Sequence, residues 1–255
     1  MHTTDPAPDL TNDAFLGGQL TLTQPASGYR AGVDPVFLAA AVPAQSGQAV
    51  LDLGCGAGAA ILCLGRRVRG LRLVGLERQS FYADLARQNA RKNALAVTVH
   101  HGDLEQMPAA LRQDRFDHVI MNPPYYRRDR GTPSPDTIRE GALGEDTPLT
   151  AWLDQATRRL MPGGHMTMIQ NAERLPEVLR AMDARLGSVV VKPLCPRVGR
   201  AASLVIVQAR KGGRGAFRLA APLVLHEGDT HRTDCDHYRP EITAILRDAA
   251  ALAIA

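Results

Sequence analysis

Two short motifs in this chain of 255 residues combine residue types that can do chemistry. DLGCGAG, residues 52–58, places an acid and three glycines in one short stretch. NPPYY, residues 122–126, places an amide before two prolines and two aromatic rings. An ordinary turn needs neither combination, so both motifs indicate a functional site rather than a simple chain reversal.

The glycine loop suits a ligand that approaches the backbone closely. Gly54, Gly56 and Gly58 permit a tight turn and close contact because glycine has no side chain. The spacing by itself is ambiguous, since Gly54, Gly56 and Ala59 also match the pattern G-x-G-x-x-G/A of dinucleotide-binding proteins. The loop therefore predicts a nucleotide-like ligand, but it does not distinguish a dinucleotide from another cofactor that contains a nucleoside.

Three acids accompany this loop and favour one of the two cofactors. Asp52 precedes the first glycine, and Glu77 and Asp103 end the next two expected strands. Glu77 suits ribose hydroxyls with either cofactor, because a carboxylate accepts from both hydroxyls. Asp52 and Asp103 are not needed to hold a pyrophosphate. They fit better around a cofactor that carries positive charge and an adenine amino group.

NPPYY suits the methylation of an amino nitrogen. The amino nitrogen of an adenine or an amide is a poor nucleophile because its lone pair is delocalised, and it must become more tetrahedral to accept a methyl group. The Asn122 side-chain oxygen and the Pro123 carbonyl can each accept one of its hydrogens. Pro123 and Pro124 restrict the backbone that carries these acceptors. The Tyr125 ring can stack on a nucleobase that is turned out of its helix. Methyl transfer does not require a side chain that removes a proton, because it depends mainly on the alignment of the methyl donor with the nucleophile.

The elements that position these motifs alternate in type between residues 48 and 210. Apolar runs predict strands at residues 49–54, 71–77, 97–103, 116–122, 165–170, 188–194 and 203–210. Helical spacing predicts helices at residues 59–68, 80–93, 149–160 and 173–186. No helix separates the last two strands, which predicts an antiparallel hairpin there.

This order predicts an α/β protein with a Rossmann-like, doubly wound, mostly parallel seven-stranded sheet and a C-terminal antiparallel hairpin. Ligands of such sheets bind beyond the carboxyl ends of the strands, near the topological switch point. We therefore expect one cleft to be lined by the residues that end four strands, namely Gly54, Glu77, Asp103 and Asn122.

Two flanks complete a three-part organisation. Residues 1–46 form an N-terminal lead, a hairpin and a helix, residues 47–210 form the core, and residues 211–255 form an extension packed on the core. Asp34-Pro35 predicts a helix start with Asp as N-cap and Pro at the first helical position. A last helix is expected from about Pro240.

Composition predicts a cytoplasmic protein that does not enter a membrane. No apolar run approaches the roughly 18 residues of a membrane span, and the first residues lack a basic segment followed by an apolar one. The four cysteines show no CxxC pair, which is typical of reduced thiols. The net charge of +4 and the dominance of arginine over lysine are compatible with a polyanionic partner.

Two further segments carry charged or metal-ligand residue types. The first segment follows NPPYY in a long loop that ends near residue 148, and we expect its arginines to contact substrate phosphates, the alternative being a solvated charge run; these are Arg127, Arg128 and Arg130. The second segment, HEGDTHRTDCDH, is rich in ligand types, but its H-E-x-x-x-H spacing is one residue too long for the helical zinc motif. Gly228 also argues against a helix, so no metal is expected.

DLGCGAG, Glu77, Asp103 and NPPYY together resemble the class I S-adenosylmethionine-dependent methyltransferases that carry an NPPY motif. The likeness is closest to the tRNA(Val) adenine-37 N6-methyltransferase family. It extends to the hairpin sequence FLGGQL, residues 15–20, and to the segment GYRAGVDPVFLAA before the glycine loop. It covers roughly residues 14 to 210.

The resemblance implies a cofactor, a substrate and a role for each matching residue. S-adenosyl-L-methionine would be the methyl donor and S-adenosyl-L-homocysteine the product, with RNA as the partner. The catalytic residues would be Asn122, Pro123, Pro124 and Tyr125. The cofactor-binding residues would be Asp52, Gly54, Gly56, Gly58, Glu77 (ribose), Asp103 (adenine) and Asn122, with Tyr29 and Asp34 from the segment that faces cofactor and target.

The leading hypothesis is N6-methylation of adenine in RNA, at tRNA adenosine 37 next to the anticodon. The alternative is a protein-glutamine N5-methyltransferase that acts on a release factor, because an amide nitrogen presents the same chemical problem. Members of that family carry a helical N-terminal domain, for which residues 1–46 leave little room. A NAD-dependent oxidoreductase or a non-catalytic nucleotide-binding module would leave NPPYY unexplained.

Overall fold

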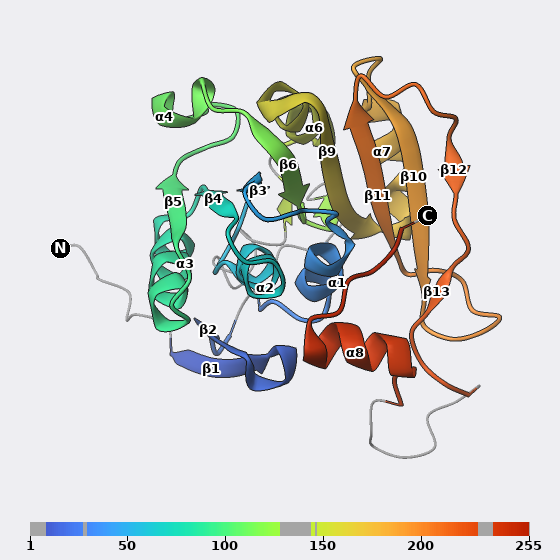
Figure 1. Cartoon of the computed structure of the whole chain (residues 1–255), viewed down its shortest axis with the longest axis horizontal. Helices are drawn as coiled ribbons and strands as arrows, with labels where there is room; N and C mark the ends of the chain where they lie inside the picture. The colour runs from blue at the N-terminus through green and yellow to red at the C-terminus, as the bar shows by residue number, and fades with distance from the viewer. Residues whose placement is uncertain (1–8, 28–29, 128–143, 146, 229–236, 255) are drawn as a thin grey trace.

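A single twisted sheet with helices on both faces organises the chain (Figure 1). The computed structural model describes residues 9–27, 30–127, 144–145, 147–228 and 237–254. No helix within these ranges combines the length and the apolar character needed to cross a bilayer.

The sheet confirms the predicted fold class. Seven longer strands run in the order β5 (Val97–His101), β4 (Arg72–Glu77), β3 (Ala49–Leu53), β6 (Phe116–Met121), β9 (Leu160–Asn171), β11 (Leu204–Lys211) and β10 (Leu186–Cys195). The first five are mutually parallel, and β11 is antiparallel to both of its neighbours. Two short strands of the C-terminal extension pair with β10 and bring the sheet to nine strands, namely β12 (Arg218–Leu219) and β13 (Leu223–Val224).

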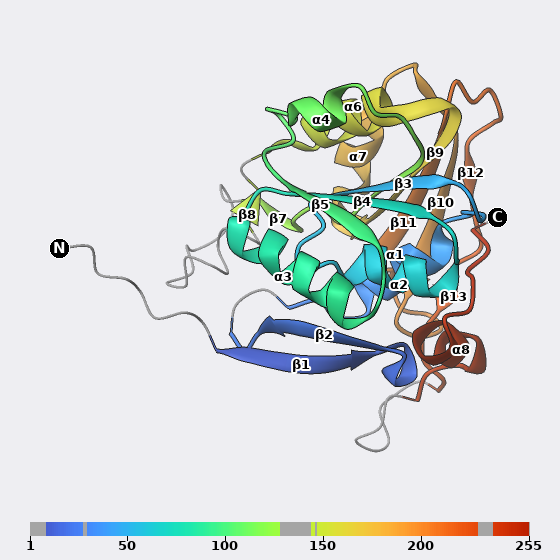
Figure 2. The ribbon, with the colours of Figure 1, turned by 60° about the vertical axis from the view of Figure 1, so that its left-hand side comes forward.

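Helices cover the two faces in two groups (Figure 2). One face carries α1 (Asp34–Ala41), α2 (Ala59–Arg67) and α3 (Ser80–Lys92). The other carries α4 (Ala109–Arg112), α6 (Leu149–Arg159) and α7 (Leu175–Ala181). The central strands are buried because both of their faces are covered, and β3 is buried at all five of its residues. A short sheet of β7 (Tyr126–Arg127) and β8 (Gly144–Glu145) begins at the last residue of NPPYY.

The topological switch point lies between β3 and β6. From β3 the chain proceeds outward to β4 and β5, whereas β6 and β9 lie on its other side. The loops that leave β3 and β6 therefore diverge to opposite faces and leave a crevice between them. Because these strands are parallel neighbours, the residues that follow them, Gly54 and Asn122, are brought to one edge of the sheet.

The N-terminal hairpin is held to the core by two asparagines, one in α3 and one directly after its last residue. The hairpin consists of β1 (Leu10–Phe15) and β2 (Leu20–Pro25), joined by a short 3-10 turn, η1 (Leu16–Gly18). The Asn89 amide accepts from the Thr23 N–H (2.7 Å) and donates to the Thr23 carbonyl (3.0 Å). Asn93 does the same at Thr21, with 2.9 and 2.8 Å. Residues i and i+4 of a helix have nearly the spacing of residues i and i+2 of a strand. The two side-chain amides can therefore pair with the backbone of β2 at alternate residues, as a neighbouring strand would.

Three details differ from the sequence prediction. The helix expected at residues 173–186 ends at Ala181, because the Asp183 carboxylate accepts from the Arg185 N–H (2.8 Å) in a turn that competes with the helix. β9 begins at Leu160, since a bulge with Gly163 at φ +78° takes up the expected turn. At the C-terminus, α8 (Pro240–Asp248) packs on α1 and η1, with its start as predicted.

A buried histidine predicts how stability changes with pH. His118 on β6 is 2% exposed, and its ring stacks on His165 with 5.8 Å between centroids. Burial, with the charges of His165 and Arg67, lowers its pKa to about 4, against a smaller opposing effect of Asp117. The unfolded chain therefore binds more protons than the folded chain between about pH 6.5 and about pH 4.

As the pH falls from about 6.5 to about 4, we expect His118 alone to lower the free energy of unfolding by up to about 3 kcal/mol. The free energy of unfolding, measured with urea across this pH range, should depend less steeply on pH in His118→Gln than in the native protein. An unchanged slope in the His118 variant would contradict this assignment.

Candidate active site

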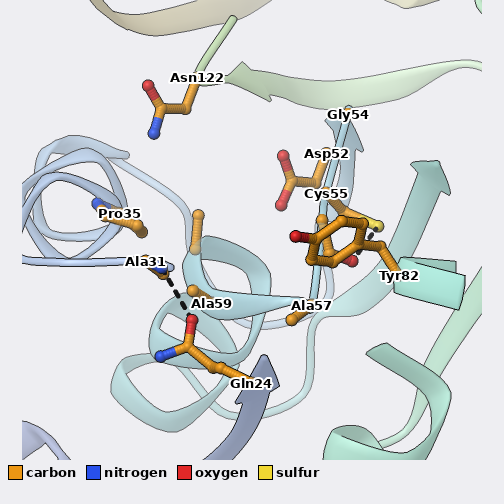
Figure 3. Close-up of a pocket in the computed structure, with 12 residues that line it drawn as sticks. Gln24, Ala31, Pro35, Asp52, Gly54, Cys55, Ala57, Ala59, Tyr82 and Asn122 are labelled. Atoms are coloured by element: carbon orange, nitrogen blue, oxygen red, sulfur yellow. Dashed lines mark hydrogen bonds between the residues drawn. The ribbon is translucent and has the colours of Figure 1, made fainter. Parts of the chain in front are cut away.

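A pocket opens at the switch point, where β3 and β6 end (Figure 3). Asp52 and Asn122 point into it from these two strands, and the Tyr82 ring of α3 closes one side. The lining residues are Gln24, Ala31, Pro35, Asp52, Gly54, Cys55, Gly56, Ala57, Ala59, Ala60, Tyr82 and Asn122. The pocket thus joins both sequence motifs and adds the hairpin and α1.

The glycine loop needs its glycines for two different reasons. Gly54, Gly56 and Gly58 all have positive φ, at +67°, +54° and +90°. A Cβ on Gly54 would also lie 2.5 Å from the Trp152 ring, whereas one on Gly56 would meet open space. Gly58 is the N-cap residue of α2. Gly54 is therefore required both by backbone conformation and by the indole beneath it.

One buried acid lines the pocket, and a second contacts its glycine loop. Asp52 is 2% exposed, and its Oδ2 has no hydrogen-bond partner among the described residues. Burial raises the pKa of Asp52 well above its usual range, and the Glu77 charge adds to this effect. Glu77 accepts from the N–H groups of Gly56 (2.9 Å) and Gln79 (2.8 Å), although burial still raises its pKa. An unpaired buried carboxylate oxygen favours a ligand with positive charge.

The NPP segment presents an acceptor with no partner. Asn122 follows β6, and its Oδ1 is buried without a hydrogen-bond partner within the described ranges. The Pro123 carbonyl accepts from Gln170 Nε2 (3.4 Å), and the Pro124 carbonyl accepts from Arg174 Nη1 (2.9 Å). The Asn122 oxygen is therefore available for a donor that enters the pocket.

The segment from α1 meets NPPYY directly. The Tyr125 hydroxyl donates to Asp34 Oδ2 at 2.7 Å across 91 positions of sequence. This corrects the predicted N-cap, because α1 is preceded by Val33 and its start has no side-chain cap bond. Burial raises the pKa of Asp34, and the Tyr125 hydrogen bond lowers it in part. The Asp34 carboxylate thus orients the tyrosine instead of capping the helix.

Other predicted site residues lie elsewhere or outside the described ranges. Asp103 does not line the pocket, and its carboxylate accepts from the Glu105 N–H (2.7 Å). Of Arg127 only the backbone, in β7, is described. The remaining predicted residues fall outside the described ranges and are Tyr29, Arg128 and Arg130. The described residues include no group of three or more acids, histidines or cysteines that could hold a metal ion, and His231 and Cys235 lie outside them.

Sequence reasoning missed three contributors to the site. Gln24 of β2 lines the pocket, and its Oε1 accepts from the Ala31 N–H (2.8 Å). Tyr82 forms a wall, and Trp152 of α6 lies under Gly54. No local motif marks these residues, because each reaches the pocket from an element remote in sequence.

A doubly wound sheet with a glycine loop and an amino-group acceptor at its switch point defines a class I S-adenosylmethionine-dependent methyltransferase. Within that class, the chain belongs to the family described as Methyltransferase small domain, whose model matches residues 32–192. The match covers both motifs and more than half of the chain.

Relatives and solved structures agree with this class. A tRNA1(Val) (adenine(37)-N6)-methyltransferase of Porphyromonas gingivalis W83 is 27% identical over 199 residues, 72% of this chain and 77% of the relative. The protein of the same name from Shewanella baltica OS155 is 28% identical over 200 residues, 76% of this chain and 82% of the relative. A structure named as a predicted O-methyltransferase from Agrobacterium tumefaciens is 27% identical to this chain, with a TM-score of 0.69. The match covers 86% of this chain and 98% of the other.

A second solved structure shares the fold at lower identity. It is the Thermus thermophilus 16S rRNA N2 G1207 methyltransferase in complex with AdoMet and guanosine. The two chains are 22% identical with a TM-score of 0.56, and the match covers 81% of this chain and 51% of the other.

The residues present fit S-adenosylmethionine. Asp52 Oδ2, which has no hydrogen-bond partner within the described ranges, suits a cationic ligand, and the open space at Gly56 permits close approach to the backbone. Glu77, which was expected in this cleft, does not line the pocket and instead accepts from the Gly56 N–H of the loop. We infer that Asp52, Gly54 and Gly56 hold the cofactor, with Glu77 supporting the loop.

The buried acid predicts a pH-dependent affinity. A bound cation stabilises the ionised form of Asp52 and lowers its pKa relative to the free protein, so affinity rises with pH until the carboxyl of the free protein is ionised. Asp52→Asn should weaken S-adenosylmethionine binding by about 10-fold where the carboxyl of the free protein is ionised, and it should remove this pH dependence. Calorimetric titrations at a series of pH values test both points. Equal pH dependence in both proteins would show that another group is responsible.

Proposed function

We propose that this methyltransferase methylates N6 of an adenine in RNA, with adenosine 37 of a tRNA as the acceptor. The observation that carries the proposal is Asn122 Oδ1, which lies in the same pocket as the glycine loop and has no hydrogen-bond partner in the part of the chain that the structure describes. The names of the relatives from Porphyromonas and Shewanella support the choice of acceptor.

The residues of the NPP segment bind and orient the target amino group in this proposal. Asn122 Oδ1 accepts one amino hydrogen and the Pro123 carbonyl accepts the other, which draws the nitrogen towards tetrahedral geometry. The second lone pair of that carbonyl remains for this purpose beside the Gln170 donor. When bound, S-adenosylmethionine supplies a methyl group on a positively charged sulfonium. The walls formed by Tyr82 and Pro35 narrow the space available to water.

Tyr125 stacks on the target base in the same proposal. Its hydroxyl is held by Asp34 at 2.7 Å, so the ring enters the encounter already oriented. A pre-oriented ring loses less conformational entropy on binding than a mobile one. The phosphates of the RNA would contact Arg127, Arg128 and Arg130, in keeping with the net charge of +4.

The test is methyl transfer from labelled S-adenosylmethionine to total tRNA, followed by nucleoside digestion and mass spectrometry. N6-methyladenosine is the expected product, and fractionation of the tRNA then identifies the acceptor. Asn122→Ala serves as the inactive control. Label in a release factor incubated in parallel, with none in tRNA, would overturn the RNA assignment in favour of glutamine methylation.

A further inference from the structure

The NPP segment cannot hold itself in place through its own backbone. Proline has no N–H, so two consecutive positions lack a donor, and the β6–β9 ladder ends at the pair Met121 and Met168. Two residues further along this register, Pro123 faces Gln170. A ladder hydrogen bond donated by the proline is impossible there, yet the carbonyl that serves as an acceptor in the proposed mechanism lies at this position.

Gln170 supplies the missing contact from its side chain. It is 0% exposed, and its Nε2 donates to the Pro123 carbonyl at 3.4 Å. Its Oε1 accepts from the Asn171 N–H at 2.8 Å, which determines the orientation of the amide. Two hydrogen bonds and full burial restrict the rotamers of this glutamine, so the Pro123 carbonyl faces an oriented donor.

Arg174 holds the next carbonyl in a similar way. Its Nη1 donates to the Pro124 carbonyl at 2.9 Å, and the rest of its guanidinium pairs with both oxygens of Glu177 at 3.1 and 2.9 Å. Asn171 caps the turn η3 (Ala172–Arg174) that carries this arginine, through the Glu173 N–H (3.1 Å). The end of β9 therefore brackets the NPP segment at two successive carbonyls.

We propose that Gln170 is a positioning residue for methyl transfer, and that it holds the Pro123 carbonyl in line with Asn122 Oδ1. The inference rests on the proposed function of the site as an amino-group methyltransferase. It holds for an adenine or a glutamine acceptor alike, because both present two amino hydrogens to the same pair of oxygens. The long contact of 3.4 Å has room to shorten when the substrate engages the carbonyl.

Gln170→Met tests the proposal, because it keeps the volume and removes the donor. The rate of methyl transfer at saturating cofactor should fall by about 10- to 100-fold, while the cofactor dissociation constant stays within about twofold. Gln208→Met is the matched control. Gln208 lies on the neighbouring strand β11 and donates to the Ala41 carbonyl at 2.7 Å, away from NPPYY. This variant should keep the native rate.

Two further readouts separate positioning from a structural role. In Gln170→Glu the isosteric carboxyl donates to the carbonyl only when protonated, so its rate relative to the native enzyme should rise as pH falls. In the Asn122→Ala background, Gln170→Met should have little additional effect, since the two acceptors act as a unit. Additive losses in this background, or a native rate in Gln170→Met, would overturn the proposal.

The outcome is distinguishable from failure of the proposed function. All variants are assayed with total tRNA and, in parallel, with a release factor. A native enzyme that labels only the release factor overturns the RNA assignment, and the Gln170 comparison is then read on that acceptor. A native enzyme that labels tRNA while Gln170→Met labels it equally fast overturns only the positioning role.

Discussion

Asn122→Ala should lower the rate of methyl transfer by about 100- to 1000-fold and leave cofactor affinity within about twofold. The reason is geometric, because Asn122 Oδ1 is buried at the pocket without a partner among the described residues. In our proposal this oxygen accepts a hydrogen bond from the target amino group while the amino nitrogen becomes tetrahedral. A contact that strengthens in the transition state acts on the rate, not on ground-state binding.

The measurement is single-turnover transfer at saturating S-adenosylmethionine, paired with a cofactor titration. Trp152 is the only tryptophan of the chain, and its ring lies against Gly54, so its fluorescence should report cofactor binding directly. Asn122→Asp is the matched variant. It keeps the acceptor oxygens and should retain more of the rate than alanine does. Parallel loss of rate and cofactor affinity in Asn122→Ala would place Asn122 at the cofactor instead.

Gly54→Ala should have the second large effect, a loss of cofactor affinity of about 100-fold or more. The new methyl group would lie 2.5 Å from the Trp152 ring, at a residue whose φ is +67°. A left-handed conformation costs an alanine about 1–2 kcal/mol, and overpacking against the indole adds about 1–3 kcal/mol. Because the strain is relieved by moving the loop, we expect it to act on cofactor binding as well as on stability.

Two controls separate the clash from the backbone strain. Gly47→Ala places the same methyl group at φ +86° in open space outside the pocket, so it should reduce stability slightly and leave affinity unchanged. Gly54→Ala combined with Trp152→Leu removes the indole and should recover part of the affinity, measured by calorimetry because the fluorophore is lost. Native cofactor affinity in Gly54→Ala alone would contradict the prediction, because it would show that the loop accommodates the added methyl group without moving.

The sequence alone predicted the mostly parallel sheet and two of the residues at its switch point, whereas Glu77 and Asp103, expected in the same cleft, do not line the pocket. Apolar runs ending in Gly54 and Asn122 predict parallel strands with loops at one edge, and both residues line the pocket. This works because burial on both faces and backbone hydrogen bonding leave a local pattern in the chain. The resemblance of the two motifs to methyltransferases then identified the family that the domain match shows.

The tertiary structure alone decided which side chains meet. Tyr125 bonds to Asp34 across 91 positions, and the predicted helix cap was wrong for that reason. Gln170 meets Pro123 because β9 lies beside β6 in the sheet, although a long stretch of chain separates them. Such pairs depend on strand order and register, which many sequences with the same apolar pattern could satisfy with different residues. Local patterns encode where a side chain is buried, whereas its partner is set by the packing of elements that are distant in sequence.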